Sequence, residues 1–380
     1  MHRVALGLLR GPNARRERLR DPTGERAGRG YILDEQFSPV WDEALLDSAR
    51  TASRGPEWWR LALEIHSRRD DYDAIVTWGE RLSLALTILQ RFAGSTKPHI
   101  AMMGQFAKPN TQVPLRLFGG SLRAVITWTS VQRRYLIERL GFRPERVYLV
   151  RHFVDQLFYS PRAAEEDTIC SVGAEMRDYP TLIEAMRGAD LRCHIAADHV
   201  RIPHRIRLVA DRRVPADKFS VPVDAKITIG RKTLPELRDL YARSRFVVVP
   251  LLPSESDNGV TVILEAMAMG KSVICSRTHG QVDVIQDGVT GIYVPTGDPA
   301  ALREAMLSLW NEPQRAHAMG ARARAYVEQH HTLDQFAMSV RAAADAALEG
   351  RPAPDSWWTG ETPLTAPARG VDLDFSAPER

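Results

Sequence analysis

Residues 254–276 read SESDNGVTVILEAMAMGKSVICS, a short acidic loop followed by an apolar helical pattern and a β-rich run. The helical pattern contains one glutamate, Glu265, among alanines and methionines. A carboxylate on an apolar stripe is costly unless a hydrogen-bonding partner comes from the protein or from a ligand. The stretch therefore predicts a buried helix between a loop and a strand, with Glu265 as a candidate binding residue.

The same alternation of β-rich runs and helical patterns extends along most of the chain. The first half has β-rich runs at 4–9, 74–78, 99–103, 124–128 and 147–150. The second half has them at 168–173, 192–197, 226–230, 246–250, 272–276 and 291–294. Such alternation is typical of parallel sheets covered by helices. We therefore expect an α/β fold with two doubly wound, Rossmann-like domains whose strand ends face each other across a cleft.

The domain boundaries follow from where the alternation restarts. We expect an N-terminal domain over 1–158 and a C-terminal domain over 159–345. Residues 346–380 are rich in proline and alanine, which predicts a tail rather than a packed core. Paired tryptophans, Trp357 and Trp358, indicate that this tail docks on the N-terminal domain.

Composition restricts the class of protein. With 380 residues, 44% hydrophobic and 26% charged, the chain is typical of a globular protein. No apolar run is long enough to span a membrane, and the N-terminus lacks a cleavage site, so we expect a cytoplasmic protein. Arginines crowd residues 10–29. This segment is either solvated or makes a peripheral contact with an anionic acceptor or lipid at the inner membrane face. It has no aromatic residue for base stacking, so nucleic acid is not an expected partner.

Cysteine and aspartate patterns give no metal site. Cys170, Cys193 and Cys275 each lie in a β-rich run, which favours reduced core residues. The Asp-x-Asp spacings at 70–73 and 372–374 are expected in solvated turns. We therefore predict no metal and no cofactor.

Three segments of the second half together resemble a known family. They are SVGAEMRDYPTLIEAM (171–186), GRKTLPELRDLYARSRFVVVP (230–250) and the stretch 254–306. In this order they resemble the C-terminal half of retaining GT-B glycosyltransferases of family 4, the glycosyltransferase group 1 type. The resemblance covers about 166–345. The first half is similar in layout and in the run 125–161, which leads into Val154, Asp155 and Phe158–Pro161.

The resemblance implies a donor site around the opening stretch. The family has two glutamates separated by seven residues, and here Asp257 and Glu265 occupy these positions. Glu265 would accept hydrogen bonds from ribose hydroxyls, and Asp257, as a catalytic-side residue, would face the hexose. Backbone N–H groups at the start of the helix would point at the diphosphate; they belong to Asn258, Gly259, Val260 and Thr261. The alternative is an ordinary Asp or Asn N-cap without a ligand.

Cations for the diphosphate are implied on two loops. The loop after the first strand of the second domain contains Gly173 and Arg177, and Arg177 is the candidate that acts on the leaving diphosphate. Lys232, after the run KITIG, is a second candidate. The alternative for Lys232 is a surface charge.

The catalytic side departs from the family pattern. Many members have a histidine after an N-domain strand, where this chain has Met103, Gly104 and Gln105. His99 lies at the other end of that strand, which favours a structural role. Glu80, after the run AIVTW, is the candidate base or sugar contact. The alternative is a carboxylate that stabilises a helix N-terminus.

The resemblance implies a retaining hexosyltransferase of EC 2.4 type. It would move a hexose from a nucleoside-diphosphate sugar to a glycan, lipid or small-molecule acceptor. Two other functions stay open at this point: a sugar-nucleotide 2-epimerase, and a sugar-nucleotide-binding protein that has lost its catalytic groups.

Overall fold

The computed structural model describes residues 2–8, 45–47, 55–106, 108–197, 199–201, 207–209 and 226–353. The Arg-rich segment 10–29, Trp357, Trp358 and the Asp-x-Asp at 372–374 lie outside these residues. The described chain forms two compact units. Unit 1 contains the residues up to Phe153 and those from Leu333 on, and unit 2 contains Val154–Thr332.

Unit 1 is built on a parallel sheet with the order β2-β1-β3-β4-β5-β6. Its strands are β1 (Val4–Leu8), β2 (Leu45–Asp47), β3 (Ala74–Trp78), β4 (His99–Met102), β5 (Ala124–Thr127) and β6 (Val147–Leu149). Its helices are α2 (Glu57–Ser67), α3 (Glu80–Phe92), α4 (Pro109–Phe118), α5 (Ser130–Glu138) and α11 (Leu333–Glu349). Short 3-10 turns cover Arg69–Asp71, Gly119–Ser121 and Pro144–Arg146.

Unit 2 is built on a second parallel sheet with the order β11-β8-β7-β12-β13-β14. Its strands are β7 (Thr168–Val172), β8 (Arg192–Ala196), β11 (Lys226–Ile229), β12 (Ser244–Val249), β13 (Ser272–Ser276) and β14 (Gly291–Val294). A separate antiparallel pair consists of β9 (His199–Arg201) and β10 (Arg207–Val209). The helices of unit 2 are α6 (Tyr179–Met186), α7 (Leu234–Arg243), α8 (Val260–Ala268), α9 (Pro299–Asn311) and α10 (Pro313–His330).

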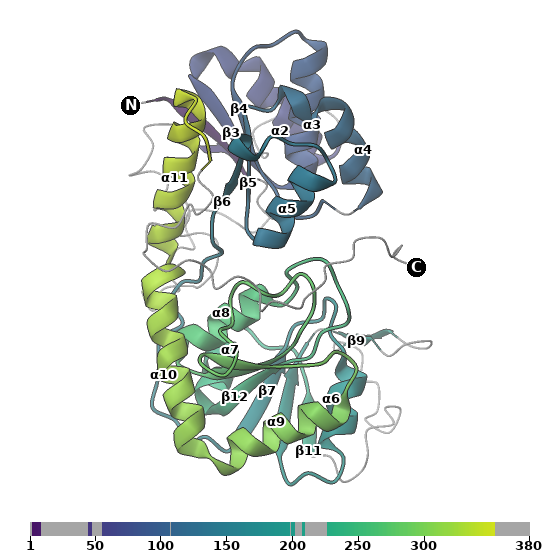
Figure 1. Cartoon of the computed structure of the whole chain (residues 1–380), viewed down its shortest axis with the longest axis vertical. Helices are drawn as coiled ribbons and strands as arrows, with labels where there is room; N and C mark the ends of the chain where they lie inside the picture. Colours follow the sequence, from purple (N-terminus) through teal and green to yellow (C-terminus); the bar gives the residue numbers. More distant parts are fainter. Residues whose placement is uncertain are drawn as a thin grey trace. The chain divides into compact units, whose positions relative to one another are not determined.

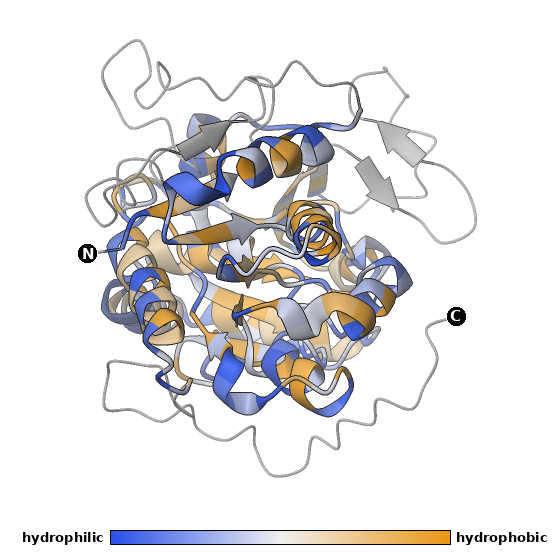
Figure 2. Cartoon of the chain, turned by 90° about the horizontal axis from the view of Figure 1, so that it is seen from above, coloured by the Kyte–Doolittle hydropathy of each residue, from blue (hydrophilic) through white to orange (hydrophobic). Residues whose placement is uncertain are grey.

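Local sequence explains where several helices of unit 2 begin. Thr233 and Glu236 form a reciprocal capping box at the start of α7. Asp298 accepts hydrogen bonds from Ala300 N and Ala301 N at the start of α9. The central strands β12 and β13 are almost completely buried, as is typical of parallel sheets covered on both faces. Figure 2 shows hydrophobic residues on the strands and on helix faces turned towards them.

The structure confirms the α/β, GT-B type of fold predicted from the sequence, with one parallel sheet in each unit. Each predicted β-rich run is a strand. The three cysteines are buried and free, as expected. Within the described part of the chain, no helix has the length and hydropathy needed to cross a membrane.

The unit boundaries differ from the expected 159–345 domain at its C-terminal end. The chain after α9 forms two helices, α10 and α11, and α11 packs with unit 1 (Figure 1). The reason is the alanine face of α11, where Val340, Ala343 and Ala344 join the same hydrophobic core as β1, β3, β4 and β5. Arg123 fixes the end of α11, since its Nε donates to Ala347 O at 2.6 Å. The expected tail boundary at 346 therefore falls inside a helix of unit 1.

Candidate functional site

The centre of unit 2's sheet contains the point where the strand order reverses. From β7 the chain continues to β8 on one side, whereas β12 lies on the other side. Ligands of open parallel sheets bind outside the carboxyl ends of the strands at such a point. The loops that begin here are 173–178, after β7, and 250–259, after β12. They are the loops that the sequence marked as donor-binding.

These two loops are joined by backbone hydrogen bonds. Asp178 N donates to Pro250 O at 3.0 Å, and Leu252 N donates to Met176 O at 3.0 Å. Asp178 also caps α6, because its side chain accepts from Thr181 N. Pairing between the loops holds their positions without a ligand. The switch point is therefore a preformed surface of backbone groups.

Arg177 lies beneath this surface rather than on it. Only 5% of the residue is exposed. Its Nε donates to Val172 O at 2.9 Å and its Nη1 donates to Glu175 O at 2.8 Å. Burial lowers the pKa of the guanidinium from its ordinary value, with partial compensation from nearby groups such as Tyr179. Arg177 thus brings a buried positive charge to the candidate site and also fixes the loop after β7.

Two glycines allow the loops to approach Arg177 and β12. Gly259 has φ +87°, and a Cβ there would lie 2.9 Å from Val249 Cγ1. Gly173 has φ +93°, and a Cβ there would lie 2.9 Å from Arg177 Nη2. Positive φ and close packing together require glycine at both positions. The structure therefore explains both glycines of the predicted donor set by backbone geometry.

The first turn of α8 has no side-chain cap. Gly259 is the N-cap residue and has no side chain to accept a hydrogen bond, while Val260 N donates to Asp257 O at 3.2 Å. Asn258 Nδ2 instead donates to Ser254 Oγ at 2.7 Å. Thr261 is exposed and Val260 is nearly buried. The N-cap is thus Gly259 rather than the Asp or Asn that the sequence left as an alternative, and the positive end of the helix dipole faces this loop.

Glu265 has a partner inside the protein. The residue is 1% exposed, and Tyr241 OH donates to its Oε2 at 2.9 Å. Burial and the adjacent Glu265 carboxylate raise the pKa of Tyr241 well above its ordinary value, so the phenol keeps its proton. The protein therefore supplies part of the stabilisation that the sequence assigned to a ligand alone.

A third loop, after β13, supports the loop that contains Asp257. Gln281 is 1% exposed, and its Nε2 donates to Asn258 O at 3.2 Å and to Asp257 O at 3.4 Å. Gly280 packs against Ser256, where a Cβ would lie 2.1 Å from Ser256 O. The sequence analysis did not identify Gln281 or Gly280. The sequence pattern that could have indicated them is their position in the loop after the central strand β13.

His279 is a further group that the sequence did not single out. Its Nδ1 lies 2.9 Å from Glu255 Oε1, so this imidazole and this carboxylate belong to adjacent loops at the carboxyl edge of the sheet. The pair ties the loop after β13 to the loop after β12. It also adds a titratable group beside the candidate site.

The structure places Lys232 at a different pocket of unit 2. Lys232 follows β11, which lies two strands from β7, or about 10 Å across the sheet. It lines a pocket of about 560 Å³ together with residues of β8, β11 and α7. Among the described residues that line this pocket, none comes from loops 173–178 or 250–259. Lys232 is therefore not part of the group formed by Gly173, Arg177 and Gly259.

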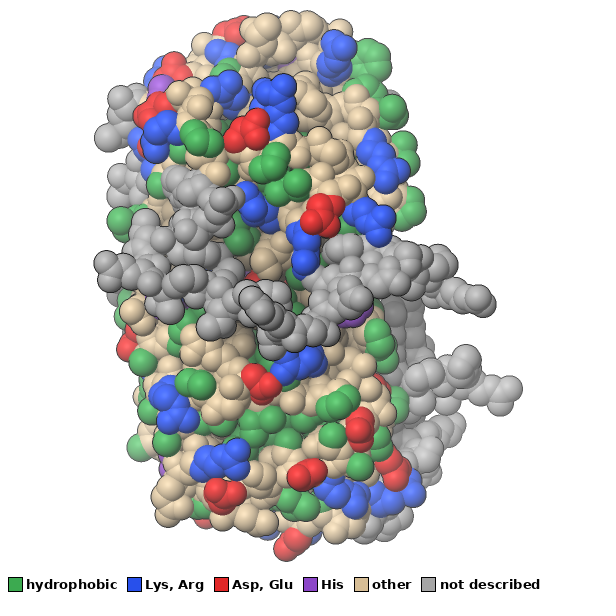
Figure 3. Space-filling model, in the orientation of Figure 1, with side chains coloured by type: hydrophobic (Ala, Val, Ile, Leu, Met, Phe, Trp, Pro, Cys, Tyr) green, Lys and Arg blue, Asp and Glu red, His purple; other side chains and the backbone are tan. Residues whose placement is uncertain are grey.

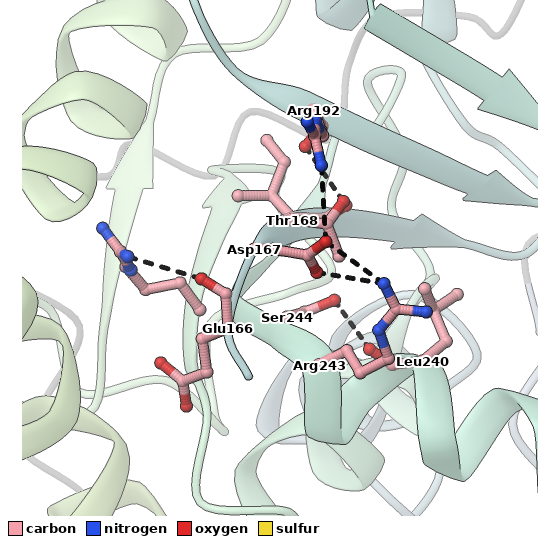
Figure 4. Close-up of polar contacts among 9 residues, drawn as sticks. Glu166, Asp167, Thr168, Arg192, Leu240, Arg243 and Ser244 are labelled. Carbon is pink, nitrogen blue, oxygen red and sulfur yellow. Dashed lines mark hydrogen bonds and ion pairs between the residues drawn. The ribbon is translucent and has the colours of Figure 1, made fainter. Parts of the chain in front are cut away.

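Internal ion pairs occupy one end of that pocket. Asp167 Oδ2 lies 3.5 Å from Arg192 Nη1, and Asp167 Oδ1 lies 3.1 Å from Arg243 Nη2. Figure 4 shows the carboxylate between the two guanidinium groups. Two of the pocket's arginines are thus paired within the protein. Of the predicted donor-binding residues, Lys232 is the one that lines this separate pocket.

In unit 1, Glu80 fastens a loop. It is the first residue of α3, and its Oε1 accepts from Gly104 N at 2.9 Å and from Gln105 N at 2.8 Å. Gly104 and Gln105 are the residues that stand where the family has a histidine. The predicted base is therefore already hydrogen bonded to the loop after β4, which favours the structural alternative for Glu80.

His99 has the structural role that the sequence predicted. It is 1% exposed, and its Nε2 lies 2.8 Å from Thr77 Oγ1. Burial lowers the pKa of His99 to about 3. The imidazole is neutral at physiological pH and lies at the amino end of β4.

The described residues contain no metal-binding cluster, that is, no group of three or more His, Cys, Asp or Glu side chains arranged to hold a metal ion. Asp70 and Asp71 of the DDYD segment lie in a 3-10 turn and pair with Arg69 and Arg68. This segment fits the solvated turn that was expected.

Comparison with known proteins finds a family model that matches part of unit 2. Residues 177–312 match the family model "Glycosyl transferases group 1". The match begins at Arg177 and includes α8 and all of the loop between β12 and α8. The matched part includes β12 and the loop before α8, whereas β7 and Gly173 precede it.

Curated relatives are similar over about half of the chain. The chain is 27% identical over 215 residues to D-inositol 3-phosphate glycosyltransferase 1 of Catenulispora acidiphila, which covers 51% of this chain and 50% of the relative. The chain thus spans about half the length of such relatives.

Solved structures with the same fold cover more of the chain. Sucrose-phosphate synthase from Thermosynechococcus elongatus has a TM-score of 0.71 at 15% identity and covers 92% of this chain and 100% of its own. Anabaena Alr3699/HepE in complex with UDP-glucose has a TM-score of 0.63 at 14% identity and covers 91% and 100%. At these identities the likeness concerns the fold.

Proposed function

We propose that this protein is a glycosyltransferase that moves a hexose from a nucleoside-diphosphate sugar to an acceptor with retention at the anomeric carbon. The observation that carries the proposal is the glycine N-cap of α8 at the switch point of unit 2's sheet. The match of 177–312 to group 1 glycosyl transferases supports it. UDP-glucose in a protein of the same fold supports the class of donor.

The donor's diphosphate would lie on the N-terminus of α8. The helix dipole and the backbone N–H of Thr261 would stabilise negative charge there, whereas Val260 N already donates to Asp257 O. Gly259 allows the positive φ and the close packing on Val249 that set the position of this helix start. The charge on the diphosphate grows as the sugar leaves, so preorganised N–H groups stabilise the transition state more than the ground state.

Glu265 and Asp257 would bind the two ends of the donor. We assign the Glu265 carboxylate to the ribose hydroxyls, with Tyr241 holding it in position through Oε2. Asp257 would contact the hexose hydroxyls, with its backbone supported by Gln281. The Glu265 carboxylate would then have two partners, Tyr241 and the ribose. Before the donor binds, the hydrogen bond from Tyr241 lowers the free-energy cost of burying Glu265.

Arg177 would act on the diphosphate from below. Its guanidinium is held by two backbone carbonyls, so its charge acts at a fixed position. A positive charge in a poorly solvated place interacts strongly with a developing anion. In this scheme the leaving phosphate accepts the acceptor's proton, and no general base is required of Glu80, which holds the loop after β4.

An epimerase would need several acid and base groups near the hexose. At the carboxyl edge of unit 1, Glu80 already accepts two backbone hydrogen bonds, and His152 after β6 packs on the ring of Trp128. We therefore favour transfer over epimerisation. Cytoplasmic location and contact of the arginine-rich segment with a membrane or an anionic acceptor are part of the same proposal.

The test has two steps. Thermal-shift measurements with UDP-, GDP-, ADP- and TDP-sugars identify the donor, since binding to the native state raises the melting temperature. The stabilising donor is then incubated with the enzyme and candidate acceptors, and the linkage is determined by NMR. A product with the donor's anomeric configuration supports the proposal. Stabilisation without release of nucleotide under any acceptor indicates a binding protein, and deuterium exchange at C2 indicates an epimerase.

A further inference from the structure

We propose that unit 1 docks on an anionic phospholipid membrane through a basic groove and an apolar rim at the amino edge of its sheet. The proposal is independent of the transfer reaction proposed above, and it rests on residues other than the arginine-rich segment 10–29. The basic groove is lined by Arg91, Lys97, Arg123 and Arg146 and has a volume of about 800 Å³. The apolar rim consists of Phe92, Val113, Leu117 and Phe118 at the ends of α3 and α4.

The basic groove has charge of one sign. Its described lining includes four cationic side chains and neither aspartate nor glutamate. The acids nearest in sequence are engaged elsewhere, because Glu349 pairs with Arg351 at 2.6 Å and Glu145 lies 3.9 Å from Arg143. Clustered cations without acids attract an anionic surface.

The contacts of the groove residues leave their charge in place. Arg123 donates to the carbonyls of Ala347 and Leu348 at the end of α11, and Lys97 Nζ donates to Tyr72 O at 2.7 Å. Carbonyl oxygens orient these side chains and do not neutralise them. The groove therefore presents fixed positive charge at its floor, with Arg91 exposed at its edge.

The apolar rim exposes an unusual amount of hydrophobic surface. Phe92 is 77% exposed, Leu117 is 69% exposed and Val113 is 53% exposed. Val113 and Leu117 are one helical turn apart on α4, so they share one face. The rings of Phe92 and Phe118 lie 6.0 Å apart and join α3 to α4. Figure 3 shows hydrophobic side chains with Lys and Arg side chains beside them over the α4 flank of unit 1.

Basic and apolar residues in this combination fit a lipid surface. Protruding aromatic and aliphatic side chains enter the interface, while Lys and Arg contact the phosphate headgroups. A soluble anion would use the cations without any need for the apolar rim. Pro98, Leu122 and Arg146 each precede a strand. The surface thus lies at the sheet edge opposite Glu80 and Gly104, so it can contact a membrane without covering them.

Co-sedimentation of the full chain with vesicles tests the proposal. We expect binding to vesicles of phosphatidylcholine and phosphatidylglycerol in equal amounts and little binding to phosphatidylcholine alone. The double variant Arg91→Glu, Arg146→Glu should bind at least roughly tenfold more weakly. The double variant Phe92→Ser, Leu117→Ser should also lose binding, and inorganic phosphate at equal phosphate concentration should displace little protein.

Matched variants separate docking from general charge effects. Arg187→Glu with Arg315→Glu makes the same change of net charge on exposed arginines of unit 2. Val289→Ser removes an exposed hydrophobic residue of unit 2. Both controls should bind like the wild type, and melting temperatures of all variants check folding. Wild-type binding by the Arg91→Glu, Arg146→Glu variant, equal binding to both vesicles, or displacement by phosphate would overturn the proposal, as would no vesicle binding at all.

Discussion

Single residues at the candidate site have two tasks, since they hold the loops and are proposed to contact the donor. Glu265 shows this most clearly. Its burial would be costly without a partner, and Tyr241 provides one. Arg177 likewise binds two carbonyls of its own loop. A substitution at either position therefore changes stability as well as binding, and the two effects need separate measurements.

Glu265→Ala should weaken donor binding by about 1 to 3 kcal/mol, because hydrogen bonds to a charged acceptor are lost. Tyr241→Phe is the matched control, since it removes the internal hydrogen bond and keeps the carboxylate. It should lower the free energy of unfolding by about 2 kcal/mol and weaken binding less than Glu265→Ala. Calorimetric titration of the folded variants checks this. Unchanged affinity in Glu265→Ala would reject its ribose role.

His99 should make the stability of unit 1 depend on pH. Its pKa is lowered from 6.5 to about 3 by burial. Between these values the unfolded state binds more protons than the native state, so stability falls as the pH drops. We expect this group to reduce the free energy of unfolding by about 2 kcal/mol from pH 7 to pH 5.

Urea unfolding at both pH values, followed by the fluorescence of the tryptophans of unit 1, measures this effect. The variant His99→Gln should lack this part of the pH dependence, whatever its stability at pH 7. If His99→Gln and the wild type lose the same free energy between the two pH values, His99 does not enter the fold as a neutral group.

At the scale of elements, sequence periodicity predicted the strands well and the loops poorly. Central strands such as β12 and β13 are continuous apolar runs, so burial determines them directly. The short strand β2 and the helix α4 lack such a signal, and both were missed. α4 contains Pro114 and exposes Val113 and Leu117, so its pattern is not that of an ordinary amphipathic helix.

The candidate site was predicted only in part, because local sequence patterns reveal strong elements and do not reveal contacts between distant residues. The loop before α8 could be located because it connects two strong elements. The hydrogen bonds that decide the role of Glu80, Tyr241 and Gln281 join residues about 24 positions apart. Local spacing does not encode such contacts. The position of Lys232 depends on the strand order, which separates β11 from β7 and is not visible in the sequence.

The start of α8 gives a sharp test at the scale of elements. Gly259→Ala should destabilise unit 2 by about 1 to 2 kcal/mol through its positive φ, and the Cβ would crowd Val249. Gly188→Ala is the matched control, with φ +70° and no atom within 4 Å of the added Cβ. Only Gly259→Ala should also lose donor binding. Equal donor affinities in thermal-shift titrations of the two variants would contradict the role of this turn.

At the scale of the whole molecule, the chain is divided differently from its sequence order. The last described helix, α11, returns to unit 1, where its alanine face completes the core beside β5. The polypeptide therefore passes from unit 1 to unit 2 and back. The point where the strand pattern restarts locates the change from unit 1 to unit 2. The return to unit 1 depends on the packing of the alanines of α11, which give little local signal in the sequence.

Val340→Asp tests this division. A buried carboxylate without a partner should strongly destabilise the core that contains Val340. Hydrogen exchange should accelerate in the amides of β5 and β6, while those of β12 and β13 stay protected. Equal acceleration in both sheets would mean that α11 stabilises the two units together.

The central claim is that the donor binds to unit 2 at the switch point between β7 and β12. Hydrogen exchange of the full chain with and without the nucleoside-diphosphate sugar that stabilises it most tests this directly. The account predicts slower exchange in residues 173–178 and in the first turn of α8, with little change around Lys232 and β11. Protection confined to the pocket of Lys232, with none at the start of α8, would contradict it.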